Sequence, residues 1–246
     1  TNKKTFVDLS SGQGTLLLGH NNRIFRSEIK NFLSLGISNF SAPNKHAVNF
    51  SNNLRKVLPE FSNFIFCNSG AEAIIKSIRI ARAITKKNLI INASGSWHGS
   101  VDQFLYYSNK KNRPIELSDG LDERTKKNLI YIPYNDVHNS LKVLKKFSKK
   151  ACCLIVEPIQ GCLPSKEGEN YIRFLYKFCK KNNLILIFDE MATGLRINCS
   201  SVQNQTKTPS DIITFGKAFS NGLPMGVIGI SKKIYNKIQK KKIKVF

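Results

Sequence analysis

The chain has 246 residues, of which 41% are hydrophobic and 22% are charged, so it can bury a sizeable core and is not a disordered or low-complexity polypeptide. No apolar run approaches the roughly 18 residues that cross a bilayer, which excludes a membrane-spanning helix. With 39 Lys and Arg residues against 16 Asp and Glu residues, the formal charge at pH 7 is +23.

This excess of positive charge is typical of nucleic-acid-binding proteins, so that class has to be considered. Most of it is Lys in short runs beside Asn, as at 86–88, 126–128 and 180–182, and not Arg interleaved with aromatic residues. The run 240–242 (KKK) is the best evidence for nucleic acid, but such runs usually form a solvated face. A compositional Lys/Asn bias explains the charge more simply, and a basic nucleic-acid-binding protein stays as the alternative from another class.

The cysteines indicate the redox compartment of the protein, and the chain ends indicate whether the sequence is part of a longer one. No CxxC pair occurs, and the cysteines have no zinc-like spacing with the four histidines, so the sequence predicts no metal site. We expect buried thiols in a reducing cytoplasm. The cysteines are Cys67, Cys152, Cys153, Cys162, Cys179 and Cys199. The chain starts without Met or an apolar signal segment and stops just after a lysine-rich stretch, so we expect a piece of a longer protein.

From residue 62 onward, short apolar runs alternate with stretches of helical periodicity, the pattern of a mainly parallel sheet flanked by helices. Strands are predicted over 64–67, 89–91, 129–132, 152–156, 184–188, 212–215 and 227–230. Helices are predicted over 71–81 and 172–179, and from Asp136 as N-cap with Val137, Leu141 and Leu144 facing inward. Residues 109–122 are predicted to form a loop, and residues 1–60 fit the alternation poorly.

Ligands of an open parallel sheet bind at the carboxyl ends of the strands, where polar clusters occur here. The first cluster is 68–72 (NSGAE), whose small residues leave backbone N–H groups open for a phosphate at a helix N-terminus. An ordinary Ser69 N-cap with Glu72 in a capping box explains it equally well, and both interpretations stay open. The segment matches neither the dinucleotide fingerprint nor the P-loop.

Three further clusters follow predicted strands. Trp97 and His98 lie in a glycine-flanked loop after 89–91, Glu157 follows 152–156, and Asp189 follows 184–188. A lone loop aromatic is more often a packing anchor than a ring-stacking group. Carboxylates at strand ends serve as metal ligands, as acid–base pairs or as partners of a cationic ring nitrogen, and their spacing does not decide between these roles.

Lys217 stands apart from the other lysines, because it is single and follows an apolar strand in the segment 214–222 (TFGKAFSNG). An arbitrary lysine is most often a solvated surface residue. A lysine in a partly desolvated pocket has a lowered pKa and forms a Schiff base with an aldehyde. Position alone does not separate these two interpretations.

Taken together and in this order, the segments 68–73, 97–99, 156–158, 188–194 and 215–217 resemble the class III pyridoxal-phosphate-dependent aminotransferases. Within that class, 39–43, 189–196 and 221–226 look most like the glutamate-1-semialdehyde aminomutase branch, which also includes aminotransferases of other substrates. The resemblance implies the large domain of the PLP-dependent transferase fold type I, an α/β fold. It also implies pyridoxal 5'-phosphate (PLP) as cofactor and a small-molecule amino donor and oxo acceptor.

The resemblance gives each cluster a role. Ser69, Gly70 and Ala71 would hold the cofactor phosphate, and Trp97, where the family usually carries Tyr or Phe, would stack on the ring. Met191, at a position often held by Val, would pack against the opposite ring face. The remaining implied residues are Lys217 as the Schiff-base and proton-transfer residue, Asp189 as partner of the pyridinium nitrogen, and Glu157 and His98 as supports.

The chain also departs from the family. It lacks the small C-terminal domain, the N-terminal lead-in and a later threonine that reaches the phosphate of the neighbouring subunit. We expect residues 1–60 to contribute to the site and to a homodimer interface, and residues 61–246 to form a truncated PLP-binding large domain. An aminotransferase of unassigned substrate is the first hypothesis, because 97–103 differs from the aminomutase pattern. Alternatives are glutamate-1-semialdehyde 2,1-aminomutase and a non-catalytic member that keeps the fold.

Overall fold

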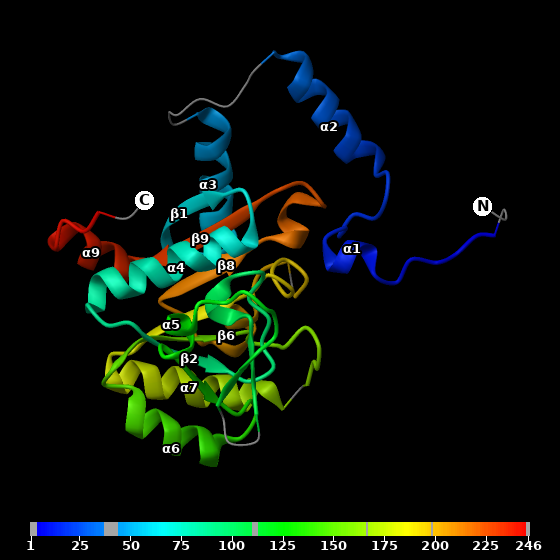
Figure 1. Cartoon of the computed structure of the whole chain (residues 1–246). Coiled ribbons are helices and arrows are strands. Elements are labelled where there is room, and N and C mark those ends of the chain that lie inside the picture. Colours follow the sequence, from blue (N-terminus) through cyan, green and yellow to red (C-terminus); the bar gives the residue numbers. More distant parts are fainter. Residues whose placement is uncertain (1–3, 37–43, 110–112, 166, 198, 245–246) are drawn as a thin grey trace.

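The computed structural model describes residues 4–36, 44–109, 113–165, 167–197 and 199–244. Its strands are β1 (Phe61–Cys67), β2 (Leu89–Ala93), β3 (Tyr106–Ser108), β4 (Pro114–Glu116), β5 (Leu129–Ile132), β6 (Ala151–Val156), β7 (Ile185–Asp189), β8 (Ile212–Phe215) and β9 (Gly226–Ser231). Seven of them form one sheet in the order β1-β9-β8-β7-β6-β2-β5, while β3 and β4 form a separate pair (Figure 1).

The large sheet is mostly parallel. The pairs β2–β5, β2–β6, β6–β7 and β7–β8 are parallel, whereas β9 runs antiparallel to both β8 and β1. Every residue of β6, β7 and β8 is buried, because helices cover both faces of the central sheet, and this explains their uninterrupted apolar sequences. The predicted α/β fold with a mainly parallel sheet is confirmed.

Helices pack on the two faces of this sheet as two hydrophobic clusters. The helices are α1 (Ser11–Gly14), α2 (Arg23–Ser34), α3 (Lys45–Val57), α4 (Gly70–Thr85), α5 (Glu123–Lys126), α6 (Val137–Phe147), α7 (Gly168–Asn182), α8 (Val202–Thr206) and α9 (Lys232–Lys240), with 3-10 turns η1 (Asp102–Phe104) and η2 (Lys217–Ser220). One cluster holds α4 and α9, and the other holds α3, α6 and α7 (Figure 1). No helix within the described ranges combines the length and hydropathy that crossing a membrane requires.

The predicted helices around 71–81, 137 and 172–179 correspond to α4, α6 and α7. Their ends follow local chemistry: Asp136 caps α6 by accepting the Asn139 N–H at 2.9 Å, and α7 ends at Asn183, which adopts a left-handed conformation. The structure corrects one detail of the predicted packing. Val137 does not face inward: it is 43% exposed, because it is the first residue of α6 and lies beyond the covered part of the helix.

Two further predictions are wrong. Cys162 and Cys199 are exposed, because they lie in loops outside the apolar strands that bury the other thiols. The predicted loop 109–122 contains β4, which pairs antiparallel with β3. The segment 39–43, one of the three with an aminomutase-like pattern, lies outside the described residues.

The N-terminal part is arranged differently from the sheet. In Figure 1, α1 and α2 project away from the sheet, whereas α3 lies beside β1. No residue of α2 is buried. Large apolar side chains in the described part of 4–36 are therefore exposed: Phe6, Val7, Leu9, Leu17, Leu18, Ile24, Phe32, Leu33 and Leu35.

Candidate active site

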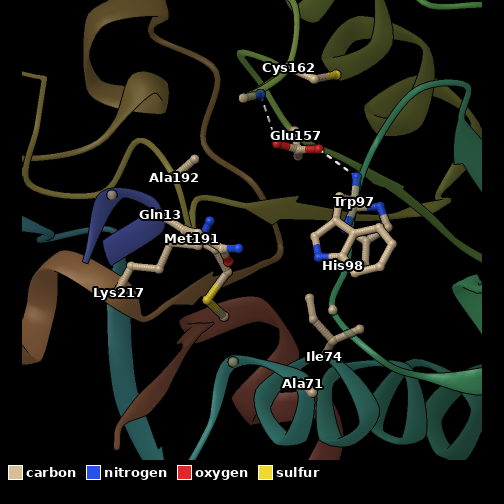
Figure 2. A pocket seen from close by; sticks show the side chains of 14 residues that line it. Gln13, Ala71, Ile74, Trp97, His98, Glu157, Cys162, Met191, Ala192 and Lys217 are labelled. Carbon is tan, nitrogen blue, oxygen red and sulfur yellow. Dashed lines mark hydrogen bonds between the residues drawn. The ribbon is translucent and has the colours of Figure 1, made fainter. Parts of the chain in front are cut away.

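A cavity of about 600 Å³ lies at the carboxyl ends of the parallel strands (Figure 2). Its walls come from α1, the start of α4, the loops after β2, β6 and β7, and the start of η2. The lining residues are Gln13, Gly14, Gly70, Ala71, Ile74, Trp97, His98, Gly99, Glu157, Gly161, Cys162, Met191, Ala192 and Lys217. Most of the residues predicted from the sequence are thus brought together, while Ser69 and Asp189 lie next to lining residues without lining the cavity themselves.

The turn before α4 combines a helix cap with an open helix end. The Ser69 hydroxyl oxygen accepts the Glu72 N–H at 3.1 Å, and the Glu72 carboxylate accepts the Asn68 N–H at 2.9 Å. This is a variant of the predicted capping box, in which the carboxylate reaches one residue further back. The N–H groups of Gly70 and Ala71 belong to the first turn and have no partner within the helix. The start of a 16-residue helix therefore faces the cavity with free donors.

Two glycines allow Met191 to lie between this turn and Lys217. A Cβ atom added at Gly70 or at Gly216 would come within 2.7 Å of the Met191 sulfur, closer than real Cβ atoms approach. The Met191 thioether thus packs directly against both backbones. Lys217 and Met191 consequently lie near the turn at the start of α4, and both side chains are on the left of Figure 2.

Lys217 is the first residue of η2 and is separated from the end of β8 by Gly216 alone. Its backbone has φ of +46°, in the left-handed region, which costs a residue with a side chain about 1 kcal/mol. Within the described part of the chain, its ammonium group makes no hydrogen bond or ion pair. The side chain is half-buried in the cavity wall, so a strained backbone presents an unpaired amine to the cavity.

Asp189 ends β7 and is held by three neighbours. Its Oδ2 atom lies 2.6 Å from His98 Nδ1, and its Oδ1 atom accepts the Met191 N–H at 3.1 Å and the Thr214 hydroxyl at 3.2 Å. His98 Nε2 lies 3.0 Å from Asn92 Oδ1. Because both side chains of the His98–Asp189 pair are fully buried, this pair forms a rigid polar group at the cavity wall, with His98 in the lining and Asp189 beyond it.

Sequence reasoning missed Asn92 and Thr214. Both are polar residues inside otherwise apolar strands, 89–93 (LIINA) and 212–215 (IITF). A polar side chain at a buried strand position needs a partner, and that requirement is a signal that a strand pattern does contain.

Glu157 connects two loops of the cavity. Its carboxylate accepts the Trp97 N–H at 2.7 Å through Oε1 and the Gly161 N–H at 3.0 Å through Oε2. Burial raises the pKa of this carboxyl, while the hydrogen bond from Trp97 lowers it. The side chain of Trp97 is 54% exposed and lines the cavity, so Glu157 fixes the backbone that carries this ring.

The neighbouring Glu190 turns away from the cavity. Its carboxylate accepts the Thr193 hydroxyl at 2.9 Å and the N–H groups of Val202 and Gln203 at 2.9 and 3.3 Å. It therefore holds the segment between β7 and α8, which includes Met191. Burial raises the pKa of Glu190 to about 7.

The N-terminal segment contributes residues that sequence reasoning did not find. Gln13 and Gly14 of α1 line the cavity. The Arg196 guanidinium donates to the Gly14 carbonyl, and the Leu18 N–H donates to Asn221 Oδ1 at 2.8 Å. No local motif marks Gln13, and its position becomes evident only when α1 is placed beside Arg196.

A model of the family described as aminotransferase class III matches residues 1–243. The chain belongs to this family. It is 34% identical over 235 residues to the glutamate-1-semialdehyde 2,1-aminomutase of Methanococcus maripaludis, covering 94% of this chain and 54% of the relative. It is 35% identical over 243 residues to the enzyme of that name from Wigglesworthia glossinidia brevipalpis, covering 95% and 54%.

The fold of this class-III family member has close counterparts among solved structures. A structure described as a transaminase with PLP bound has a TM-score of 0.84 and 26% identity, covering 93% of this chain and 54% of its own. The chain spans about half the length of the curated relatives it matches. The family predicted from the motifs is therefore confirmed, and so is the fold of a PLP-dependent transferase.

Proposed function

We propose that the protein is an enzyme that moves amino groups with PLP, and that Lys217 holds this cofactor. One observation carries the proposal: an unpaired lysine on a strained backbone shares a cavity with the free N–H groups at the start of α4. An amine that bonds to an aldehyde and a helix end that binds a phosphate are the two anchors that PLP requires.

The other residues also fit the cofactor. Gly70, Ala71 and the Ser69 hydroxyl hydrogen supply donors for the phosphate, and the Trp97 ring is exposed to the cavity. When bound, PLP supplies the electron sink for the charge left on a substrate carbon that loses a proton. Lys217 is the group placed to take that proton and to return it.

The remaining hydrogen-bonding capacity of Asp189 supports its proposed role as the partner of the ring nitrogen. A carboxylate offers about four lone-pair sites, and the protein uses three of those on Asp189. The fourth site is available to a protonated ring nitrogen, and ionisation of Asp189 would keep that nitrogen charged. His98 and Glu157, which line the cavity, act through Asp189 and through the Trp97 loop respectively.

Two reactions use this machinery. An aminomutase returns the amino group to the adjacent carbon of the same molecule, whereas a transaminase passes it to a second molecule. The names of the curated relatives favour glutamate-1-semialdehyde 2,1-aminomutase. The segment 97–103, which differs from the aminomutase pattern, favours the second reaction.

The test uses the full-length protein with PLP, reduced with borohydride and mapped by mass spectrometry. We expect one adduct, on Lys217, and we expect Lys217→Ala to abolish it. The same substitution should lower the turnover rate at least about a thousandfold. Lys232→Ala, on the remote helix α9, is the matched control. An adduct on another lysine, or none, would contradict the proposal.

The reaction is assigned by adding glutamate-1-semialdehyde alone. A product with its amino group on the adjacent carbon, formed without a second substrate, identifies an aminomutase. Turnover that requires a separate amino donor and oxo acceptor identifies a transaminase.

The proposal includes a homodimer, with residues 1–60 at its interface and beside the site, and residues 61–246 as the PLP-binding large domain. The exposed apolar side chains of α2, such as Ile24 and Leu33, support an interface there. The free cysteines support a reducing compartment such as the cytoplasm. Light scattering of the full-length protein tests the dimer, because a monomeric mass at micromolar concentration would contradict it.

A further inference from the structure

Buried polar side chains beside the cavity link β2 to Asp189. Asn92 Oδ1 lies 3.0 Å from His98 Nε2, and the neighbouring Tyr131 hydroxyl donates to the Tyr106 carbonyl at 2.6 Å. Asn92 and Tyr131 are direct partners in the parallel register of β2 and β5. Asn92, His98 and Tyr131 are all at most 2% exposed, so water does not replace these contacts.

The direction of each bond follows from what its atoms can donate. The structure places the Asn92 carbonyl oxygen, Oδ1, 3.0 Å from His98 Nε2. That oxygen only accepts, so His98 Nε2 carries a hydrogen.

The other ring nitrogen faces a carboxylate. A bare Nδ1 lone pair opposite an ionised oxygen at 2.6 Å would be repulsive, so one proton lies between His98 and Asp189. The hydrogen bonds that Asp189 Oδ1 accepts from Met191 and Thr214 stabilise the ionised carboxylate. The proton therefore belongs to Nδ1, and the ring carries both hydrogens.

Other charged groups lie around the pair. Glu157, after β6, lines the same cavity as His98, and Glu190 is the residue after Asp189. Lys217, on η2, is the cation that shares the cavity. Phe104 covers the His98 ring edge-to-face at 4.9 Å between centroids, and this contact fixes the plane of the ring.

We propose that Asn92 is a positioning residue that keeps His98 in its doubly protonated form and thereby keeps Asp189 ionised. The consequence for the cofactor rests on the proposed function: an ionised Asp189 is the partner that a protonated ring nitrogen needs. Asn92 acts through His98 and touches no reacting atom.

The test is nitrogen NMR of the full-length protein with ¹⁵N-labelled histidine rings, with and without PLP, at a pH of about 8, where an unpaired histidine is neutral. The spectrum of His98→Asn assigns the His98 signals. We expect both His98 nitrogens to carry hydrogens in the wild type, even without PLP. A wild-type ring with one bare nitrogen would overturn the proposal.

Variants at Asn92 separate positioning from packing. Asn92→Leu removes the acceptor, and we expect the His98 signals of a neutral ring and about tenfold weaker PLP binding. Asn92→Asp keeps an acceptor oxygen and should retain the doubly protonated ring. An unchanged His98 spectrum in Asn92→Leu would refute the role of Asn92.

Asn92→Ala is the second variant if Asn92→Leu fails to fold. It also removes the acceptor at 3.0 Å from His98 Nε2, so the hydrogen on that nitrogen should be lost; retention of the wild-type pattern would contradict the proposal. A protein that shows the expected ring signals but binds no PLP would refute the proposed function and leave this inference standing.

Discussion

Helices α4 and α2 are both amphipathic, yet they have opposite fates. Helix α4 buries seven residues, among them Ile74 and Ile78, against β6, β8 and β9. Helix α2 buries none, and Leu33 on it is 68% exposed. Since the energetic gain of an apolar face comes from its removal from water, the described part of this chain stabilises α4 through burial but contributes little to α2 in this way.

The same contrast divides the cavity. Nearly all of its walls belong to the sheet region, which is packed on both faces, whereas Gln13 and Gly14 come from the N-terminal region. The chemistry of Lys217 and Asp189 thus rests on the part of the molecule that this chain stabilises itself. The N-terminal region closes one side of the cavity through few contacts.

The largest expected effect comes from the same substitution made in each region. Leu175 on α7 is fully buried, so Leu175→Ala should lower the free energy of unfolding by about 2–5 kcal/mol. Leu33→Ala should change it by less than about 0.5 kcal/mol in a monomer. Urea unfolding at several protein concentrations measures both. A large, concentration-dependent effect of Leu33→Ala would show that a second copy covers α2.

The next effect concerns Glu190, which fastens the segment that carries both Met191 and Arg196. Its folded pKa of about 7 exceeds the ordinary value of 4.5, so the folded protein binds this proton more tightly than the unfolded chain. The contribution of Glu190 to the free energy of unfolding, roughly 3 kcal/mol, is fully present below about pH 4.5. It is lost as the pH rises through about 7.

Urea unfolding across this pH range tests the Glu190 prediction. Position 190 cannot titrate in Glu190→Gln. The free energy of unfolding of the wild type should therefore fall relative to that of the variant as the pH rises from about 4.5 to above 7. Glu123→Gln, at an exposed position on α5, is the control. A pH-independent difference between wild type and Glu190→Gln would contradict the raised pKa.

A smaller effect distinguishes two helix caps. Ser69→Ala removes the cap of α4 at the cavity, and Ser231→Ala removes the cap of α9 at the opposite edge of the sheet. Each should lower the free energy of unfolding by about 1 kcal/mol. Only Ser69→Ala should also weaken PLP binding, by about tenfold, because its hydroxyl is proposed to donate to the phosphate. Equal PLP affinities in the two variants would remove Ser69 from the site.

The sequence predicts the sheet region well because its central strands are covered on both faces. Such burial requires continuous apolar runs, as in 152–156, and these runs are visible without a structure. The antiparallel direction of β9 is not visible, because a buried strand has the same sequence pattern in either direction. Strand β4 is missed because its three residues are largely exposed and carry no alternation.

The candidate site is predictable where a residue stands at the end of a strand. Lys217, Asp189 and Glu157 are all found in this way, because each stands at the end of a buried strand or within two residues after it. Asn92 is missed because it lies inside the strand, and Gln13 because it comes from a region whose placement depends on contacts far along the chain. Val137 shows a related limit, since periodicity predicts the apolar stripe of a helix but not how much of that stripe is covered.

The smallest expected effect tests how loosely the N-terminal region closes the cavity. Arg196→Ala removes the donor to the Gly14 carbonyl, one of the few bonds that hold α1 beside the cavity. Because Arg196 is exposed, the free energy of unfolding should change by less than about 0.5 kcal/mol, and KM should rise by about two- to fivefold with the Lys217 adduct retained. Arg124→Ala, at an exposed ion pair on α5, should leave KM unchanged. If Arg196→Ala also left KM unchanged, Gln13 and Gly14 would not shape the substrate site, and the sheet region would form it without them.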